Sequence, residues 1–231
     1  MQTVILAGGL GTRLRPLTEK TPKPMVEVGG RPFLEYIVRH LERQGFRRLL
    51  ILISYLGEHV QQYFGDGRGW GVQIDYCREL TPLGTGGALR NALEKLDEEF
   101  LLLYGDSYLP IDYRRVVQVF RSSRSSALMV VYDNNLTDTG VKNNVAMDDD
   151  RYVTQYDKVS SNPGLKYVEA GALCFQRHVF QSLPGDQVIS LEQSLFSRLI
   201  GKRELRGFIT SQRFFDIGTP ERLLEFASVR Q

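Results

Sequence analysis

Several features that mark specialised protein classes are scarce or missing in this chain of 231 residues. Its two cysteines, Cys77 and Cys174, stand far apart and in no metal-ligand spacing, so we expect buried thiols in a reducing compartment. The three histidines, His40, His59 and His178, are equally scattered, which argues against a zinc site. No apolar run approaches the ~18 residues that a membrane span needs, and no basic segment followed by an apolar stretch and a cleavage site opens the chain. We therefore expect a cytoplasmic protein that does not act at a membrane.

An excess of charge of one sign is also missing. The chain has 29 Lys and Arg against 27 Asp and Glu, so no global field recruits nucleic acid or a membrane surface. Any binding of anions must therefore be local. The length suits one large α/β domain over residues 1–231, and a domain of this size buries roughly 70% or more of its unfolded surface.

The pattern of apolar segments predicts an α/β fold with three layers. In the first half, strands over 3–7, 48–53, 72–77 and 100–104 alternate with helices over 32–44, 57–64, 88–96 and 112–122, which indicates a parallel, Rossmann-like sheet with helices on both faces. In the second half, strands over 127–133, 144–147, 152–156 and 166–175 follow one another with short connectors, which indicates a mixed or antiparallel extension. A capping box from Ser190 to Gln193 predicts a helix to about residue 200, and Thr219-Pro220 opens the last helix.

A glycine-rich turn follows the first predicted strand. Residues 4–14 read VILAGGLGTRL, and Lys23 follows in a Pro-Lys-Pro triplet. The backbone amides of such a turn can surround phosphate oxygens, and Arg13 and Lys23 add two cations. The turn is not a P-loop, because no Lys-Ser or Lys-Thr pair follows, and Leu14 stands where a dinucleotide fingerprint needs a small residue. A left-handed turn with two solvated basic residues would explain only the glycines, so the pattern favours a nucleotide site.

The positions from Gly8 to Thr18, GGLGTRLRPLT, together with residues 22–24, resemble the signature of the sugar-phosphate nucleotidyltransferases. The resemblance covers nearly the whole chain and implies that family's mixed, mostly parallel sheet. It also implies a phosphate site at the turn, with Arg13 and Lys23 balancing the charge that builds on the triphosphate. Nearby Arg15 and Lys20 read as solvated surface charge. The nucleotide-binding residues expected in this part of the chain are Leu6, Ala7, Gly8, Gly9, Gly11, Thr12, Arg13 and Lys23.

Two acidic motifs resemble the family's metal-binding segments. Residues 101–107, LLLYGDS, resemble the strand-Gly-Asp motif, and residues 214–220, FFDIGTP, resemble the second acidic motif. Asp106 and Asp216 would supply hard oxygen ligands suited to Mg²⁺, which takes one or two carboxylates and completes its shell with phosphates and water. A Gly-Asp pair after a strand is by itself commonly a turn. With both motifs and the glycine loop present, we expect a Mg²⁺ site and include Asp106 with Arg13 and Lys23 among the catalytic residues.

Residues 79–88, ELTPLGTGGA, resemble the family's base-reading loop. The resemblance implies that the Glu79 side chain and the Gly84 backbone hold the base edge, with Thr85 in the same site and Gly86 and Gly87 opening a helix nearby. A carboxylate can only accept hydrogen bonds, and guanine presents two parallel donors, N1–H and N2–H₂. Uracil presents one donor between two carbonyls. Glu79 therefore favours GTP.

The segments expected to bind a sugar phosphate lie in the second half. QYDKV at 155–159 resembles the segment whose lysine, here Lys158, contacts the acceptor phosphate, although Asp157 replaces the usual glutamate. In residues 169–171 the resemblance implies that Glu169 accepts sugar hydroxyls and Gly171 leaves room for the ring. Residues 143 and 144 belong to the loop that would cover the sugar phosphate, and we assign Asn144 to the sugar-phosphate site. An equal alternative for these asparagines and for Asp157 is that they are ordinary polar residues at the edge of a strand and bind no ligand.

Together these resemblances imply a nucleotidyltransferase. A sugar 1-phosphate would attack the α-phosphate of an NTP and release pyrophosphate, and the pattern is similar to guanylyltransferases of mannose or heptose 1-phosphate. A uridylyltransferase of an amino-sugar or muramic acid 1-phosphate is the alternative within the class. A non-catalytic protein that senses sugar nucleotides is the alternative outside this enzyme class. The sequence leaves open the sugar and the assembly state, a homodimer included.

Overall fold

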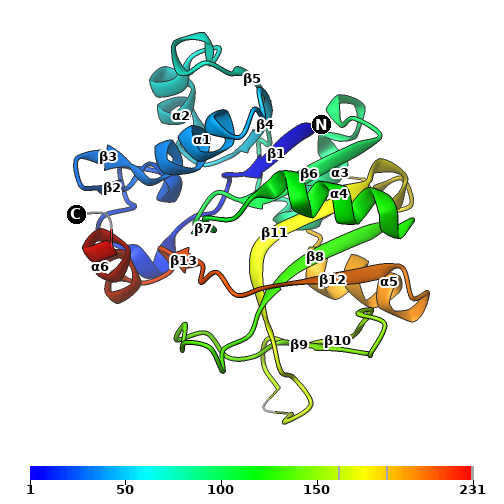
Figure 1. Ribbon diagram of the computed structural model, residues 1–231. Coiled ribbons are helices and arrows are strands. Elements are labelled where there is room, and N and C mark those ends of the chain that lie inside the picture. The colour runs from blue at the N-terminus through cyan, green and yellow to red at the C-terminus, as the bar shows by residue number, and fades with distance from the viewer. Residues whose placement is uncertain (161, 186, 230–231) are drawn as a thin grey trace.

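The computed structural model describes residues 1–160, 162–185 and 187–229. A seven-stranded sheet forms its centre, with the strand order β12-β8-β11-β6-β1-β4-β5 (Figure 1). Strands from both halves of the chain share this sheet. In sequence order they are β1 (Gln2–Leu6), β4 (Arg48–Ile53), β5 (Gln73–Arg78), β6 (Glu99–Tyr104), β8 (Ala127–Tyr132), β11 (Val168–Gln176) and β12 (Leu205–Thr210).

The sheet is mixed and mostly parallel, as the sequence predicts. β1 pairs in parallel with β4 and β6, β4 with β5, and β8 with β12. Only β11 runs antiparallel to both of its neighbours, β6 and β8. The parallel register aligns Leu6 with Tyr104, so the ends of β1 and β6 lie at the same edge. In α/β sheets of this kind ligands bind beyond the carboxyl ends of the strands.

Alternate side chains of each central strand build two separate cores, one on each face of the sheet. In β1, Val4 belongs to one core and Ile5 to the other, and both side chains are fully buried. This division follows from the two-residue period of a strand, and it explains why strands covered on both faces read as continuous apolar runs. One core includes side chains of α1 (Phe33–Arg43), α2 (Gly57–Phe64), α4 (Tyr113–Ser123) and α6 (Pro220–Val229). The other includes α3 (Gly84–Asn91) and α5 (Ser197–Gly201), which completes the three predicted layers.

Some predicted elements differ from the structure. The helix expected over 88–96 begins earlier, at Gly84, ends at Asn91 and is followed by a 3₁₀ turn, Leu93–Lys95. The helix expected from Ser190 starts as a π-helix, Leu191–Phe196, before α5. The edge strand β12 has no counterpart among the predicted elements, because a charged residue and a glycine interrupt its apolar pattern. Within the described ranges, no helix has the length and apolar character needed to cross a bilayer.

Three two-stranded sheets surround the central one. β9 (Val145–Met147) pairs with β10 (Val153–Tyr156), and β2 (Glu27–Val28) pairs with β3 (Arg31–Pro32). β7 (Ser107–Tyr108) pairs with β13 (Phe215–Asp216) directly after the end of β6. This last ladder brings the second acidic motif, from the end of the chain, to the first one.

An aromatic cluster fixes the C-terminal helix against the rest of the fold. The Phe226 ring is fully buried, and its centroid lies 4.9 Å from Phe33, 5.2 Å from Tyr36, 5.6 Å from Tyr108 and 6.0 Å from Phe215. These rings come from α1, β7 and β13. Packing of α6 therefore supports the strand that carries Asp216.

Replacing Phe226 with Ala is expected to lower the free energy of unfolding by ~3–5 kcal/mol, because it removes a large buried ring and leaves a cavity. Urea denaturation followed by circular dichroism measures this change. Leu224→Ala, at a position of α6 that is 70% exposed, is the matched control and should change stability little. Equal midpoints for the two variants would contradict the anchoring role of Phe226.

Candidate active site

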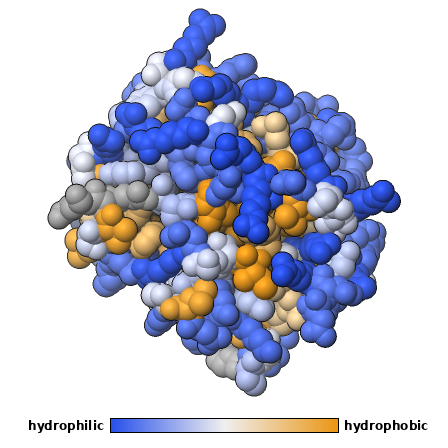
Figure 2. Space-filling view, in the orientation of Figure 1, coloured by the Kyte–Doolittle hydropathy of each residue, from blue (hydrophilic) through white to orange (hydrophobic). Residues whose placement is uncertain are grey.

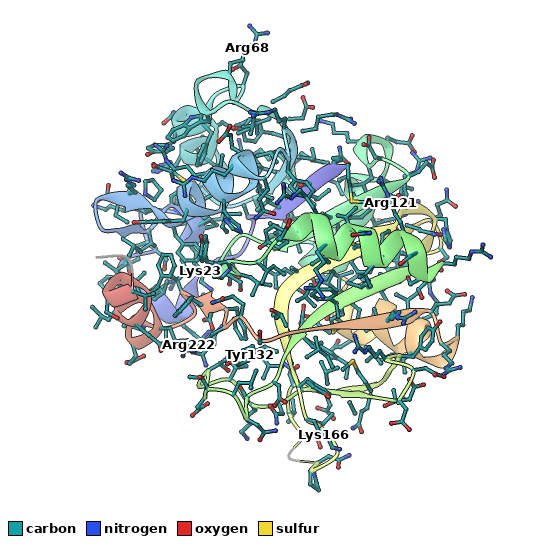
Figure 3. The ribbon with its side chains drawn as sticks, viewed as in Figure 1. Lys23, Arg68, Arg121, Tyr132, Lys166 and Arg222 are labelled. Atoms are coloured by element: carbon teal, nitrogen blue, oxygen red, sulfur yellow. The ribbon has the colours of Figure 1, made fainter. Side chains whose placement is uncertain are left out.

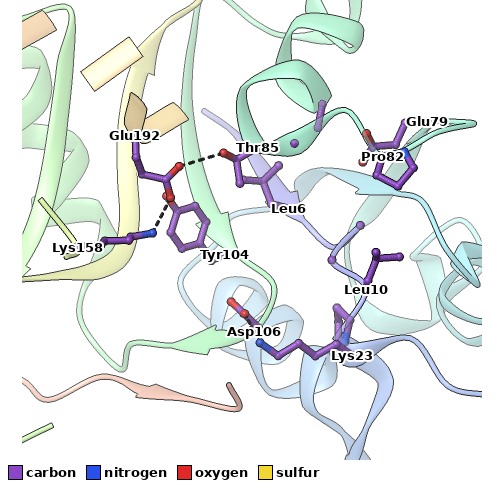
Figure 4. Close-up of a pocket in the computed structure, with 15 residues that line it drawn as sticks. Leu6, Leu10, Lys23, Glu79, Pro82, Thr85, Tyr104, Asp106, Lys158 and Glu192 are labelled. Carbon is purple, nitrogen blue, oxygen red and sulfur yellow. Dashed lines mark hydrogen bonds and ion pairs between the residues drawn. The ribbon is translucent and has the colours of Figure 1, made fainter. Parts of the chain in front are cut away.

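A cavity of about 340 Å³ opens beyond the carboxyl ends of β1, β5 and β6 (Figure 4). It is walled on one side by the glycine-rich turn and on the other by the start of α3. Most residues that the sequence assigns to the nucleotide line it. The predicted residues on its wall are Leu6, Gly8, Gly9, Lys23, Glu79, Gly84, Thr85 and Asp106.

A second cavity of about 430 Å³ adjoins the first, and Tyr104, Asp106 and Lys158 line both. The four residues that the sequence assigns to the sugar phosphate all line this second cavity: Asn144, Lys158, Glu169 and Gly171. Asp216 and Arg13 lie on its wall as well. Arg13 is thus placed on the acceptor side rather than in the first cavity.

A short ion pair stands where the two cavities meet. Lys23 Nζ donates to Asp106 Oδ2 at 2.5 Å, and the Lys23 side chain is only 9% exposed. Burial raises the pKa of the Asp106 carboxyl, but the Lys23 ammonium and the Ser107 hydroxyl lower it more, and the net shift is downward. Figure 3 shows Arg68 at the top of the molecule and Lys166 at its lower end, with Lys23 between them. Asp106 therefore stays ionised beside a fixed cation.

Glu79 follows β5 and lies against the glycine-rich turn. Its Oε2 accepts from Leu83 N–H at 2.8 Å, while Oε1 makes no hydrogen bond to the described residues. A side chain at Gly8 would place its Cβ 2.7 Å from Glu79 Oε1, so this glycine leaves room for the carboxylate. Burial raises the pKa of Glu79. One carboxylate oxygen is thus fixed by its own loop, and the other is available to a ligand.

The predicted base loop is packed against a segment far along the chain. Gly84 has φ +73°, and a Cβ there would lie 2.6 Å from Ile189 O. Ile189 O also accepts from the N–H groups of Gly86 and Gly87, at 2.8 and 3.2 Å. These amides of α3 are therefore occupied within the protein. We attribute the glycines of this loop to close packing as well as to ligand access.

Lys158 and Glu192 form an ion pair at the junction of the cavities. Lys158 Nζ donates to Glu192 Oε1 at 2.6 Å, as Figure 4 shows. Burial acts against the charge of Lys158, but Glu169 and then Glu192 raise its pKa above the ordinary value. Asp157, the neighbour of Lys158, lines neither cavity and accepts from the N–H groups of Val159 and Ser160 in a turn. Glu192 was not assigned from the sequence, where it stands inside a capping box.

Glu169 lies at the start of β11 with one oxygen engaged. Its Oε2 accepts from the Tyr156 hydroxyl at 2.6 Å, and Asn144 Oδ1 accepts from Glu169 N–H at 2.9 Å. Its Oε1 is buried without a hydrogen-bond partner in the described part of the chain. Burial raises the pKa of Glu169, and Lys158 opposes that shift. The predicted asparagine thus orients the strand that carries Glu169.

Asp216 is held by a cation of α6. Arg222 Nη1 lies 3.0 Å from Asp216 Oδ2 and 3.2 Å from Oδ1, and Arg222 Nη2 donates to Gly140 O at 2.8 Å. The Asp216 position opposes Ser107 in the ladder, and Ile217 N–H donates to Asp106 O at 3.0 Å. Of the two predicted metal ligands, Asp216 therefore lies on β13, and Asp106 lies in the turn directly before its partner strand β7.

Two carboxylates fit Mg²⁺, which takes its other ligands from phosphates and water. Over the described residues no group of three or more His, Cys, Asp and Glu side chains gathers as a ready metal site. A metal would thus depend on the substrate for part of its shell. Arg222 and the metal would then both bind the Asp216 carboxylate.

Not every predicted residue reaches a cavity wall. Ala7, Gly11 and Thr12 line neither cavity, and Ala7 is buried with its N–H donating to Leu52 O at 2.8 Å. Conversely, several residues on the walls were not assigned from the sequence. In the first cavity these are Leu10, Pro24, Pro82, Ala88, Tyr104 and Glu192, and in the second they include Ser107, Lys142, Phe214 and Arg222. Most of these stand inside the family-like motifs quoted above, as Pro24, Pro82 and Tyr104 do, whereas Lys142, Glu192 and Arg222 stand outside them.

The surface on the face shown in Figure 2 is mainly hydrophilic, and its hydrophobic residues gather in small patches near the middle. The second cavity has four basic residues on its wall, Arg13, Lys142, Lys158 and Arg222, against the three acidic residues Asp106, Glu169 and Asp216. Such a wall suits a phosphate group with hydroxyls attached. The arrangement can hold two phosphate-bearing ligands end to end.

Comparison with known proteins identifies the relatives of this chain. Residues 2–230 match the nucleotidyl transferase family. A mannose-1-phosphate guanylyltransferase of Mycobacterium tuberculosis is 31% identical over 96% of this chain, which spans 62% of that enzyme's length. A D-glycero-alpha-D-manno-heptose 1-phosphate guanylyltransferase of Campylobacter jejuni is 32% identical over 98% of both chains. A glucose-1-phosphate uridylyltransferase of Synechocystis is 30% identical over 87% of this chain and 55% of its own length.

A solved structure extends the likeness to three dimensions. The crystal structure of HddC from Yersinia pseudotuberculosis complexed with GMP-PN has a TM-score of 0.82 and 27% identity, covering 100% of this chain and 99% of that chain. The match therefore extends over every strand of the central sheet.

Replacing Lys23 with Met is expected to raise the pKa of the Asp106 carboxyl, because burial persists while the neighbouring cation is lost. Carboxyl-carbon NMR during a pH titration measures this shift. In the wild type the lowered pKa adds stability above the unfolded value, about 3.9, and that stability is lost as the pH falls through the folded value. Lys20→Met, at an exposed position of the same segment, is the control. An unchanged titration of Asp106 in the Lys23 variant would show that the ion pair is absent in solution.

Proposed function

The chain belongs to the nucleotidyl transferase family, and on that premise we propose that it joins GTP and a sugar 1-phosphate into a GDP-sugar and releases pyrophosphate. One observation carries the proposal: two cavities, one lined by the predicted nucleotide residues and one by the predicted acceptor residues, meet at Asp106 and Lys158. The α-phosphate and the acceptor phosphate would meet there. In-line attack needs this end-to-end placement.

The reaction needs no nucleophile from the protein, because the acceptor phosphate attacks the α-phosphorus itself. Such transfers depend on positioning and on electrostatic stabilisation. Lys23, fixed by Asp106, would face the triphosphate. Arg13 and Lys158 line the second cavity and would hold the acceptor phosphate against the reacting centre. Charge that moves to the leaving pyrophosphate would then be balanced by groups already in place.

Asp106 and Asp216 would hold Mg²⁺. Bound there, the metal would draw charge from the phosphate oxygens and help to orient them. The support is the donor set itself: Asp216 on β13 and Asp106 in the turn directly before its partner strand β7, both lining the second cavity. Arg222, which pairs with Asp216, would keep that carboxylate in place when the metal is not bound.

The preference for GTP rests on Glu79. Its Oε2 accepts from Leu83 N–H, and its Oε1 faces the turn at Gly8 with no protein donor among the described residues. Oε1 and the remaining lone pair of Oε2 can accept the two parallel donors of guanine. The guanylyltransferases among the relatives support the same base. The uridylyltransferase relative keeps UTP as the alternative, since the two classes share the fold.

For the acceptor we propose a mannose- or heptose-type sugar 1-phosphate, by analogy with the named guanylyltransferases. Lys158 would contact its phosphate and Glu169 its hydroxyls, with Asn144 orienting Glu169. We place the whole of residues 1–231 in one catalytic domain that acts in the cytoplasm; the shared central sheet supports the single domain. A homodimer is the assembly that light scattering should test first.

A matrix of NTPs against sugar 1-phosphates, read by pyrophosphate release, should give the highest kcat/KM with GTP and mannose 1-phosphate or a heptose 1-phosphate. A bidentate base contact discriminates by ~1–3 kcal/mol, so GTP should exceed UTP by roughly 5- to 150-fold. Binding of nucleotide without turnover on any acceptor would instead support the sensor function.

Replacing Glu79 with Gln should lower the GTP to UTP ratio. The Leu83 N–H would bind the amide oxygen, so the amide NH₂ would take the place of Oε1 and face guanine donors. UTP, which offers carbonyl acceptors, should lose less or gain. An unchanged ratio, or a tenfold preference of the wild type for UTP, would replace the guanylyl assignment with the uridylyl one.

Replacing Asp106 with Asn should lower turnover by ~10²–10³-fold, as the loss of a main electrostatic element typically does. It should also weaken Mn²⁺ binding, measured by water-proton relaxation in the presence of a non-reactive GTP analogue. Asp97→Asn, at the opposite end of β6 where Asp97 pairs with Arg48, is the control and should leave both quantities unchanged. Full activity of the Asp106 variant, or activity of the wild type in EDTA, would contradict the metal site.

A further inference from the structure

The residue whose position the family motifs do not explain is Glu192, in the first turn of a π-helix, Leu191–Phe196. π-helical turns are rare and occur frequently at functional sites. Glu192 lines the first cavity, although it lies more than a hundred residues from the base loop in sequence. Its carboxylate contacts side chains from both ends of the site.

The segment that carries Glu192 is fastened to the base loop by the backbone. Ile189 N–H donates to Leu83 O at 2.7 Å, and Leu191 N–H donates to Thr85 Oγ1 at 2.9 Å. Gly86 N–H donates back to Ile189 O at 2.8 Å. The backbone directly before Glu192 is thus hydrogen-bonded to the loop expected to hold the base.

The Glu192 carboxylate itself joins this loop to Lys158. Its Oε2 accepts from the Ser190 hydroxyl at 2.5 Å and from Thr85 Oγ1 at 3.4 Å, and its Oε1 accepts from Lys158 Nζ at 2.6 Å (Figure 4). The Glu192 side chain is 17% exposed, whereas that of Lys158 is 52% exposed. The better-buried carboxylate, held by two hydroxyls, can therefore set the position of the more exposed ammonium.

Besides Glu192, the Lys158 ammonium contacts the ring of Tyr156, whose centroid lies 5.8 Å from Nζ. Glu192 is the only hydrogen-bond partner of its Nζ among the described residues. A free lysine side chain samples many rotamers, and ordering it costs up to ~2 kcal/mol. The charges of Glu169 and Asp106 also act on this ammonium from the second cavity. Without Glu192, the Glu169 carboxylate, which lines only the second cavity, would attract the ammonium into that cavity.

We propose that Glu192 is a positioning residue, which holds the Lys158 ammonium at the junction of the two cavities and ties its place to the base loop through Ser190 and Thr85. The inference rests on the proposed function, in which Lys158 contacts the acceptor phosphate. Glu192 acts on the acceptor through Lys158 and has no contact of its own with it.

The test is a double-mutant cycle between Glu192 and Lys158, with GTP and mannose 1-phosphate or whichever acceptor the wild type uses. Glu192→Ala should lower kcat/KM for the acceptor by ~10–100-fold, because small misplacements of a positioning group cost about this much. Glu192→Gln should keep most of the activity, since its amide oxygen still accepts from Lys158. In a Lys158→Ala background, Glu192→Ala should change kcat/KM less than twofold. Glu98→Ala, which removes a surface partner of Arg177, is the control and should leave the kinetics unchanged.

The alternatives give different results. If Glu192→Ala costs as much without Lys158 as with it, Glu192 serves only the base loop and the inference is wrong. The same holds if its main effect is on the KM for GTP. A lower KM for the acceptor in Glu192→Ala would show that the carboxylate competes with the phosphate, which also overturns the proposal. Failure of the wild type to turn over any acceptor would instead count against the proposed function, and thermal unfolding of each variant shows whether it folds.

Discussion

The end of β6 is the constraint on which the rest of the site depends. This strand pairs in parallel with β1 on one side and antiparallel with β11 on the other. Parallel pairing ends β1 beside β6, and Gly105 N–H extends the contact by donating to Leu6 O at 2.9 Å. Antiparallel pairing makes β11 begin where β6 ends. The glycine-rich turn and Glu169 therefore both lie next to Asp106, on opposite sides of it.

Charge at this point is compensated within the protein. Asp106 pairs with Lys23, Asp216 with Arg222, and Glu192 with Lys158. The first and third pairs join segments far apart in the chain, whereas Asp216 and Arg222 are six positions apart, and each pair includes a group expected to contact phosphate or metal. Partly buried ions are costly unless they are paired, so these contacts keep the site charged and ordered before a ligand arrives. In the proposed function, a phosphate would then exchange partners with groups that are already in position.

The glycines of the two loops illustrate how packing and binding share one sequence motif. Gly8 leaves room for Glu79, and Gly84 leaves room for the Ile189 carbonyl. A phosphate-binding interpretation alone would not account for either contact. The same absence of a side chain that lets a ligand approach the backbone also lets two loops approach one another, so a motif can be retained for both reasons.

The sequence by itself determined the order of strands and helices, the two-sided burial of the central sheet and the family-like motifs around Gly8, Glu79 and Asp106. These features are local, because the two-residue period of a strand, the residues of a turn and a contiguous motif all depend on residues that are close together in the sequence. The strand β12 was missed, because Arg206 and Gly207 interrupt its pattern and its place depends on pairing with β8.

Only the tertiary structure decided which side chains meet. It placed Arg13 on the second cavity, assigned Asp157 to a turn, left Ala7, Gly11 and Thr12 away from both walls, and brought Glu192 and Arg222 to the site. Glu192 reaches Thr85 across 107 positions and Lys158 across 34. Such contacts arise from sheet order and helix packing rather than from any neighbouring residue. A carboxylate next to a capping serine has the same local sequence whether it faces water or a lysine at the centre of a site.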